Sequence, residues 1–208
     1  GVDLRDAIES GAVLGPRMAT GASALMTSVG GTAGRLIPDE GERGYAHVVG
    51  TRDEIVREVR RQIKSGVDWV KVHATGLIPR QREAGEIQVW SLEELQTVVS
   101  AAHDLGVPVV AHCRNSSSTR DCARAGVDLI LHATFMQEDA LAAVVARKVP
   151  LVPTLTFQAN LAEHGAKVGS DPALMEVFRR EISGSAGALR RAHDAGVPLL
   201  CGSESGFS

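Results

Sequence analysis

One short pattern occurs four times in the 208 residues and limits the folds that the chain can adopt. In each copy a helical stretch ends in Gly-Val, then comes Asp or Pro, and a short apolar run follows, as in IKSGVDWVKV, HDLGVPVVAH, ARAGVDLILH and HDAGVPLLCG. Glycine tolerates the left-handed conformation that closes a helix, and a continuous apolar run is typical of a strand buried on both faces. We therefore expect helices that alternate with parallel strands. The repeat glycines are Gly66, Gly106, Gly126 and Gly196.

Five amphipathic stretches lie between the expected strands and predict helices. Thr51 with Glu54 and Ser91 with Glu94 have the spacing of a capping box, in which a hydroxyl and a carboxylate satisfy backbone amides at the start of a helix. Strands that alternate with helices pair in parallel through right-handed crossovers, in an open doubly wound sheet or a β/α barrel. The predicted helices are Thr51 to Ser65, Ser91 to Leu105, Ser116 to Ala125, Gln137 to Arg147 and Asp171 to Ala195.

Two further apolar segments, Pro16 to Gly21 and Val149 to Thr154, bring the predicted strands to six. A closed β/α barrel has eight strands, with its active site at their carboxyl ends. We therefore predict an α/β fold of the (β/α)8 TIM-barrel type that is incomplete in this chain, with about six strands. We expect residues 1–208 to form a single, partial barrel domain.

Two segments are too long to be ordinary connections between the predicted helices and strands. The segments Ala22 to Gly50 and Leu77 to Trp90 are predicted to be loops, either functional loops at strand C-termini or surface insertions. Gly1 leads straight into a helical sequence, and Ser208 follows a strand that has no closing helix, so we expect a fragment. Open sheet edges pair readily with other chains, which favours a longer parent chain or a homo-oligomer.

Composition excludes several classes of function. The chain is 44% hydrophobic and 23% charged, as in globular domains, and its net charge of -3 comes with no basic face for nucleic acid or an anionic membrane. We expect a small-molecule substrate. Cys113, Cys122 and Cys201 show no close pairing, so we predict neither a disulfide framework nor a zinc knuckle. With no long apolar run and no signal-peptide pattern, the expected location is the cytoplasm.

Four polar residues stand at equivalent places after the repeat glycines. Lys71 follows its glycine by five residues, His112 and His132 follow theirs by six, and Glu204 follows its glycine by eight. All four therefore belong at strand ends on one face, which is the catalytic face of a β/α barrel.

Two imidazoles on adjacent strands suit zinc, which takes neutral nitrogen ligands and can leave one position for a nucleophilic water. A lysine beside such a metal must be neutralised, paired or modified. By contrast, His103 and His193 precede repeat glycines by three residues and belong at helix C-termini on the opposite face. A cation complements the helix dipole there, so we interpret these two as structural.

The segments DWVKVHATG, VVAHC and LILHAT resemble those of the amidohydrolase superfamily, within it the imidazolonepropionase-like and Xaa-Pro dipeptidase-like hydrolases. The resemblance implies that Lys71 becomes a carbamate that bridges two metals and that His112 and His132 bind the outer metal. It implies one or two divalent ions, with zinc expected, and a shared hydroxide that hydrolyses a C–N bond in an amide, carbamate, urea or short peptide. The family's first-strand His-x-His pair has no counterpart in this chain.

Several positions depart from the family pattern. The chain has GSESG where the family usually has Gly-Thr-Asp-x-Gly, so Glu204 takes the place of the Asp that binds metal and shuttles the proton. Thr32 stands where dipeptidase-like members have a His that holds the substrate carboxylate. Arg114 stands where they have a Tyr, and it either binds an anion in a bidentate way or is a solvated strand-end charge. Tyr45 and His47, in the long loop, either approach the substrate or form plain surface.

Two other functions remain open. The chain could be a catalytically inactive barrel scaffold, which the missing strands and Glu204 favour, because fold alone does not imply activity. It could also be a Schiff-base aldolase, since a buried Lys71 with a lowered pKa would be free to attack a carbonyl. The aldolase interpretation leaves His112 and His132 without a role.

Overall fold

The computed structural model describes residues 1–30, 46–77 and 86–204 of the chain. Within these ranges no helix is both long and apolar enough to cross a membrane. The strands are β1 Ala24–Met26, β2 Ala46–Val48, β3 Val70–His73, β4 Thr75–Leu77, β5 Ile87–Gln88, β6 Val109–Cys113, β7 Leu129–His132 and β8 Leu151–Val152. The α-helices are α1 Val2–Glu9, α2 Arg52–Lys64, α3 Leu92–His103, α4 Ser116–Ala125, α5 Glu138–Arg147, α6 Leu155–His164 and α7 Pro172–Asp194, and Gly165–Val168 forms a 3-10 helix.

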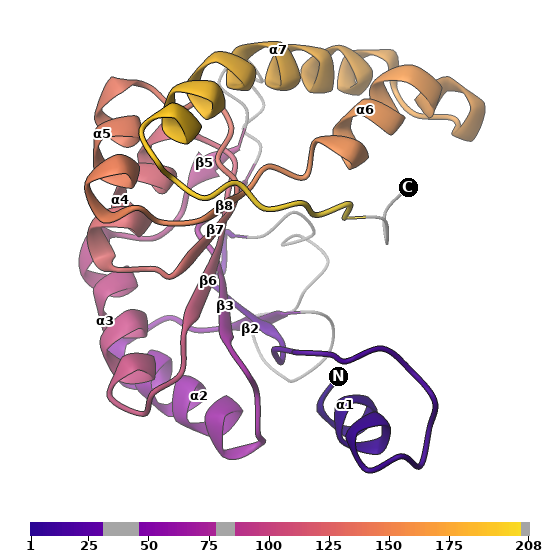
Figure 1. The fold of residues 1–208 in the computed structure, drawn as a ribbon. Helices are drawn as coiled ribbons and strands as arrows, with labels where there is room; N and C mark the ends of the chain where they lie inside the picture. Colours follow the sequence, from indigo (N-terminus) through magenta and orange to yellow (C-terminus); the bar gives the residue numbers. More distant parts are fainter. Residues whose placement is uncertain (31–45, 78–85, 205–208) are drawn as a thin grey trace.

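Six strands form one parallel sheet in the order β2-β1-β3-β6-β7-β8, and β4 pairs with β5 in a separate antiparallel pair. The helices α2, α3, α4 and α5 pack against one another in chain order along one side of this sheet (Figure 1). Each crossover through a helix returns the chain to the next parallel strand, so the carboxyl ends of all six strands lie at the same edge.

The hydrophobic core fills the space between the sheet and these outer helices. Val72 of β3 and Ile130 of β7 are fully buried, as are Val59 of α2 and Leu95 of α3. Burial of such side chains stabilises the fold by about 1.5 to 3 kcal/mol each. The core therefore holds the strand ends in place from one side of the sheet.

Local sequence signals predicted the helices well. All five predicted helices are present within two residues of the expected bounds, and the capping box of Ser91 and Glu94 is complete. At Thr51 the hydroxyl accepts the Glu54 amide, and the Glu54 carboxylate accepts the amide of Gly50. The predicted left-handed conformation is confirmed at all four repeat glycines, Gly66, Gly106, Gly126 and Gly196.

The predicted strand at Pro16 to Gly21 is wrong. This segment is half-exposed or exposed, and the first strand begins three residues later at Ala24, where Ala24, Leu25 and Met26 are buried. A second strand, β2, also lies in the segment predicted to be a loop. A central parallel strand needs apolar residues for both faces, and the segment from 24 to 26 meets that need better than residues 16–21.

The other end of the sheet also differs from prediction. β8 covers only residues 151–152 of the predicted strand, because Thr154 already caps α6, a helix that was not predicted. Between Gly196 and Glu204, the last described residue, the chain makes one isolated parallel bridge, Leu151 to Leu199. The segment from 77 to 90, predicted to be a loop, includes β5 and the last residue of β4. The main sheet has six strands, as predicted, but not all of them are the strands that were predicted.

Two of the repeat glycines, Gly106 and Gly126, allow a matched test of the left-handed backbone conformation. Gly106 (φ +75°) has open space where a Cβ would lie, whereas at Gly126 (φ +100°) a Cβ would meet side-chain atoms of Val99 at 3.3 Å and Arg147 at 3.4 Å. We predict that Gly106→Ala costs about 1 to 2 kcal/mol of unfolding free energy through strain alone and that Gly126→Ala costs more. Gly187→Ala, in the interior of α7 with free space around it, should instead stabilise. Urea unfolding measures all three, and equal costs for the first two would contradict the contact argument.

A buried carboxylate joins two turns of α2. Glu58 is only 4% exposed and accepts hydrogen bonds from Arg61 Nε at 2.7 Å and Gln62 Nε2 at 2.9 Å. Burial by itself would raise the pKa of Glu58, but the bonds from Arg61 and Gln62 outweigh it and leave the pKa below its usual value. The ionised form is therefore the one that the fold stabilises.

This lowered pKa predicts how stability depends on pH. A carboxyl with a depressed folded pKa contributes stability above its unfolded pKa, near 4.3 for Glu, and this contribution is lost as pH falls through the folded pKa. We expect Glu58→Gln to lower the unfolding free energy at pH 7 by about 1 to 3 kcal/mol. The difference from wild type should shrink as the pH falls below about 4. Urea unfolding of both proteins at pH 7 and below about pH 4 tests this prediction. A difference in unfolding free energy that does not change with pH would contradict it.

Candidate active site

Lys71 and His112 lie on neighbouring strands, and His132 lies on the next one. β3, β6 and β7 are adjacent and parallel, and the register aligns His73 with His112. Alternate residues of a strand point to opposite faces, and Val72 belongs to the core under the helices. Lys71, His73 and His112 therefore share the opposite face of the sheet.

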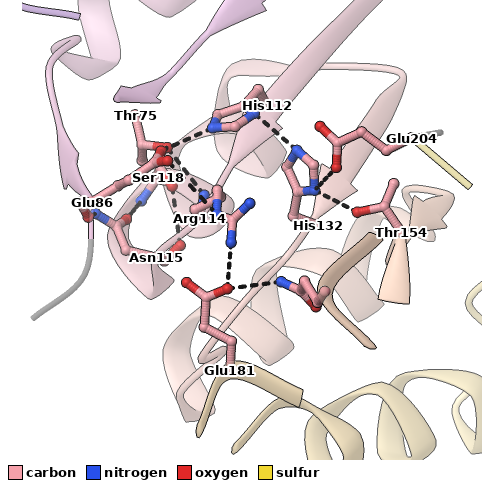
Figure 2. Close-up of polar contacts among 11 residues, drawn as sticks. Thr75, Glu86, His112, Arg114, Asn115, Ser118, His132, Thr154, Glu181 and Glu204 are labelled. Carbon is pink, nitrogen blue, oxygen red and sulfur yellow. Dashed lines mark hydrogen bonds and ion pairs between the residues drawn. The ribbon is translucent and has the colours of Figure 1, made fainter. Parts of the chain in front are cut away.

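His112 and His132 meet directly (Figure 2). Nδ1 of His112 lies 2.8 Å from Nε2 of His132, the ring centroids are 4.4 Å apart, and the planes are at 75°. Both side chains are buried, and burial, followed by neighbouring positive charges, holds the pKa of His132 well below its usual value. His132 is therefore neutral near pH 7, which is the form that binds metals.

Each imidazole has a second partner at its outer nitrogen. His112 Nε2 lies 2.9 Å from Oε2 of Glu86, and His132 Nδ1 lies 2.6 Å from Oγ1 of Thr154. Burial would raise the pKa of Glu86, but His112 and Arg114 outweigh it and lower that pKa, so the carboxylate can only accept and His112 donates. The single proton of the Thr154 hydroxyl goes to the Pro153 carbonyl at 2.7 Å, so this oxygen accepts from His132.

These outer bonds assign the tautomers and leave the facing nitrogens, His112 Nδ1 and His132 Nε2, without protons of their own. Two lone pairs at 2.8 Å repel each other unless a cation, a proton or a metal ion, lies between them. Zinc with two Zn–N bonds of about 2.0 to 2.1 Å at tetrahedral angles needs the nitrogens about 3.3 Å apart. The two imidazoles therefore fit a shared metal ion after a widening of about 0.5 Å.

Glu204 and Lys71 complete the predicted group of four. Oε2 of Glu204 is 3.7 Å from Nδ1 of His132, on the ring edge that faces away from His112. This oxygen is buried and has no hydrogen-bond partner in the described parts of the chain. Burial lowers the pKa of Lys71, and the Glu204 carboxylate opposes this effect. Lys71 is thus a half-buried amine that releases its proton more easily than a free lysine.

The two imidazoles converge on one point, but Glu204 does not join them there. Across residues 1–30, 46–77 and 86–204, no three His, Cys, Asp or Glu side chains are placed to hold one metal ion together. The metal-binding roles of Lys71, His112, His132 and Glu204 therefore stay predictions, with the facing imidazoles as the part of the donor set that fits.

A third histidine belongs to the same group and was missed in the sequence. The ring of His73 stacks on that of His112, with centroids 4.6 Å apart and planes at 21°. Burial, then the charges of His112 and Lys71, holds the pKa of His73 well below its usual value. The signal was available, because a residue two places after Lys71 on a strand must share its face.

Arg114 is buried in an ion-pair network rather than solvated (Figure 2). Its guanidinium donates to Glu181 of α7, and Nε lies 3.7 Å from Oε1 of Glu86. Gln158 of α6 donates to the same Glu181 oxygen at 2.8 Å. Burial raises the pKa of Glu181, although Arg114 opposes it. The solvated alternative for Arg114 is therefore wrong, and its role toward substrate stays a prediction. Glu86, Gln158 and Glu181 carried no motif that would have singled them out.

The remaining predicted substrate residues lie elsewhere. Nε2 of His47 in β2 is 3.8 Å from Oε2 of Glu58, on α2. His47 thus points to the helix-covered face of the sheet and is not among the side chains around His112. Tyr45 and Thr32 lie outside the described residues.

Backbone strain is concentrated where the sheet strands end. Of the six non-glycine residues with positive φ in the described ranges, five follow or close a strand-like segment at this edge: His132, Ala133, Phe135, Thr154 and Glu204. A regular pleat would direct His132 to the side of Cys113, its partner in register and a core residue. The φ of +71° at His132 ends the pleat, and its ring lies against His112 instead. Strain of this kind persists where the surrounding structure enforces it, and it is common at active sites.

Comparison with known proteins shows the family and the fold of the chain. A model of the amidohydrolase family matches residues 2–208. An uncharacterised protein of Mycobacterium tuberculosis is 27% identical over 164 residues, which cover 78% of this chain and 44% of that protein. The crystal structure of a Xaa-Pro dipeptidase with bound methionine has a TM-score of 0.80 at 28% identity and covers 100% of this chain and 52% of its own. Ochratoxinase of Aspergillus niger has a TM-score of 0.82 at 21% identity, over 98% and 50% of the two chains, which shows a shared fold.

The chain spans about half the length of these relatives. The likeness to the dipeptidase confirms the predicted incomplete β/α barrel. Because the family model covers nearly every residue, the resemblance seen in the sequence is confirmed, and the chain belongs to the amidohydrolase family.

Proposed function

We propose that this chain carries part of the active site of a metal-dependent hydrolase that cleaves a C–N bond in an amide, carbamate, urea or short peptide. The observation that carries the proposal is the pair of facing nitrogens of His112 and His132 at adjacent strand ends. Two such lone pairs call for a cation, and membership of the amidohydrolase family supports this chemistry. The activity is proposed for the full-length polypeptide, because the chain spans about half of its relatives.

In this proposal His112 and His132 bind a divalent ion through their facing nitrogens. Zinc suits neutral imidazole ligands, and when bound it would polarise the scissile carbonyl and lower the pKa of a water molecule. Lys71, as a carbamate, would bridge this ion to a second one. Its lowered pKa supports that role, because only the neutral amine reacts with carbon dioxide.

Glu204 would take the proton of the attacking water and return it to the leaving nitrogen, as a general base and then a general acid. Its buried Oε2 has no hydrogen-bond partner in the described residues and is therefore available to accept a proton. A carboxylate on a longer arm than Asp can perform both steps if the pocket places it within hydrogen-bond reach of the reacting atoms.

Within this reaction class we propose a dipeptide-like substrate. The likeness to a Xaa-Pro dipeptidase, at 28% identity over the whole chain, supports it. Arg114 as the residue that binds the substrate carboxylate is a further part of this proposal, although Glu86 and Glu181 compete for the same guanidinium. A homo-oligomer in the cytoplasm is the assembly and location that we propose from the sequence.

Removal of one imidazole tests the metal assignment. We expect His112→Ala in the full-length polypeptide to lower bound zinc and hydrolysis of a dipeptide panel. The loss should exceed the roughly 10- to 100-fold that is typical when a residue hydrogen-bonded to a metal ligand is removed. His103→Ala is the matched control, because His103 lies at the C-terminus of α3 and bonds Asp128. Elemental analysis and amine release measure the effect. Unchanged metal and activity in His112→Ala would rule out the proposal and favour an inactive scaffold.

A neutral Lys71 amine suits both the hydrolase and the Schiff-base aldolase. The product that this amine forms distinguishes the two functions. We expect 13C-labelled bicarbonate to give a lysine carbamate signal in the 13C NMR spectrum of the wild type and none in Lys71→Arg, since arginine keeps the charge and is not deprotonated in proteins. Treatment with borohydride and an aldehyde or ketone should add no mass to the peptide that contains Lys71. Trapping of an adduct at Lys71 would favour the aldolase instead.

A further inference from the structure

Glu86 holds the outer edge of His112, although the two residues are 26 positions apart in the chain. Glu86 directly precedes β5 and is 6% exposed. Its Oε2 accepts from His112 Nε2 at 2.9 Å and from the Thr75 hydroxyl at 2.7 Å. Its backbone carbonyl accepts from Asn115 Nδ2 at 2.8 Å. Side chain and backbone are thus both fixed beside β6.

The direction of these hydrogen bonds determines which nitrogen of His112 carries the proton. The Thr75 oxygen accepts the backbone amide of Arg114 at 3.1 Å, so its own proton is directed to Glu86. An ionised carboxylate donates nothing, so the proton shared with His112 belongs to Nε2. His112 Nδ1 is then left with its lone pair toward His132.

Neutralisation of Arg114 is the other role that Glu86 could have. The distances argue against it as the main role, because Arg114 donates directly to Glu181 and lies 3.7 Å from Glu86, whereas His112 lies 2.9 Å from Glu86. Arg114 has its counter-ion on α7, and the nearest polar partners of Glu86 are Thr75 and His112.

We infer that Glu86 is a positioning residue for His112, which holds the Nε2–H tautomer and so presents the Nδ1 lone pair as a metal ligand. This inference deepens the proposed function and rests on it for the word ligand. Carboxylates that accept the second N–H of a metal-binding His fix its ring and raise its basicity, and their loss typically weakens metal affinity 10- to 100-fold.

The test compares Glu86→Gln with Glu58→Gln in the full-length polypeptide. Both replace a buried carboxylate that accepts hydrogen bonds from two side chains, Arg61 and Gln62 at Glu58 and Thr75 and His112 at Glu86. Glu58 lies on α2, away from His112. We expect Glu86→Gln to weaken zinc affinity, measured by competition with a chelator, by about 10- to 100-fold, and Glu58→Gln to leave it unchanged. Thr75→Val removes one hydrogen bond to Glu86 and should weaken zinc affinity less than Glu86→Gln. This milder variant keeps the test decisive if Glu86→Gln fails to fold.

A second readout needs no metal. Long-range 1H–15N correlation spectra of the metal-free protein should show His112 as the Nε2–H tautomer in the wild type and in Glu58→Gln, and a mixture of tautomers in Glu86→Gln. Equal zinc affinity and an unchanged tautomer in Glu86→Gln would overturn the inference. If the wild type binds no zinc, the proposed function fails, and the tautomer alone still decides whether Glu86 positions His112.

Discussion

The parallel ladder between β6 and β7 pairs Cys113 with His132 and leaves His112 one residue earlier on the neighbouring strand. The sheet and its outer helices hold this register through a continuous apolar core, in which Cys113 itself is buried. A regular pleat would keep the two imidazoles on opposite faces, and the left-handed backbone at His132 brings them together. The site therefore combines a rigid ladder with one strained residue, and the strain brings the two imidazoles into contact.

Electrostatics explains why this arrangement is poised for a cation. His73, His112 and His132 form a row of buried rings in which burial keeps at least the outer two neutral, and Lys71 releases its proton more easily than usual. Neutral nitrogens bring donor capacity without positive charge, which is what a divalent ion requires of its ligands. The nearby Glu204 supplies a buried oxygen without a hydrogen-bond partner in the described residues.

A network of buried charges lies beside this row and contacts it through Glu86 and His112. Glu86, Arg114 and Glu181 connect the segment before β5, the end of β6 and helix α7, so that three elements meet at one ion-pair network. Breaking a buried ion pair leaves an uncompensated charge, which is costly, and the network therefore restrains the side chains that contact His112. The family relationship covers residues 2–208. Glu204 and Arg114 differ from the residues that the sequence resemblance led us to expect at those positions.

Sequence by itself determined five of the helices, the left-handed repeat glycines and the places of His112 and His132 at strand ends, because caps, hydrophobic period and glycine conformation act over a few residues. Lys71, predicted at a strand end, is instead the second residue of β3 and pairs with Val110. Tertiary structure decided the rest. The first strand falls at Ala24 rather than in the segment from 16 to 21, because burial between neighbouring strands selects it. Glu86 is 26 residues from His112 in the chain, and Glu181 is 67 residues from Arg114. No local pattern links such pairs, since only the packing of the sheet and helices brings them into contact.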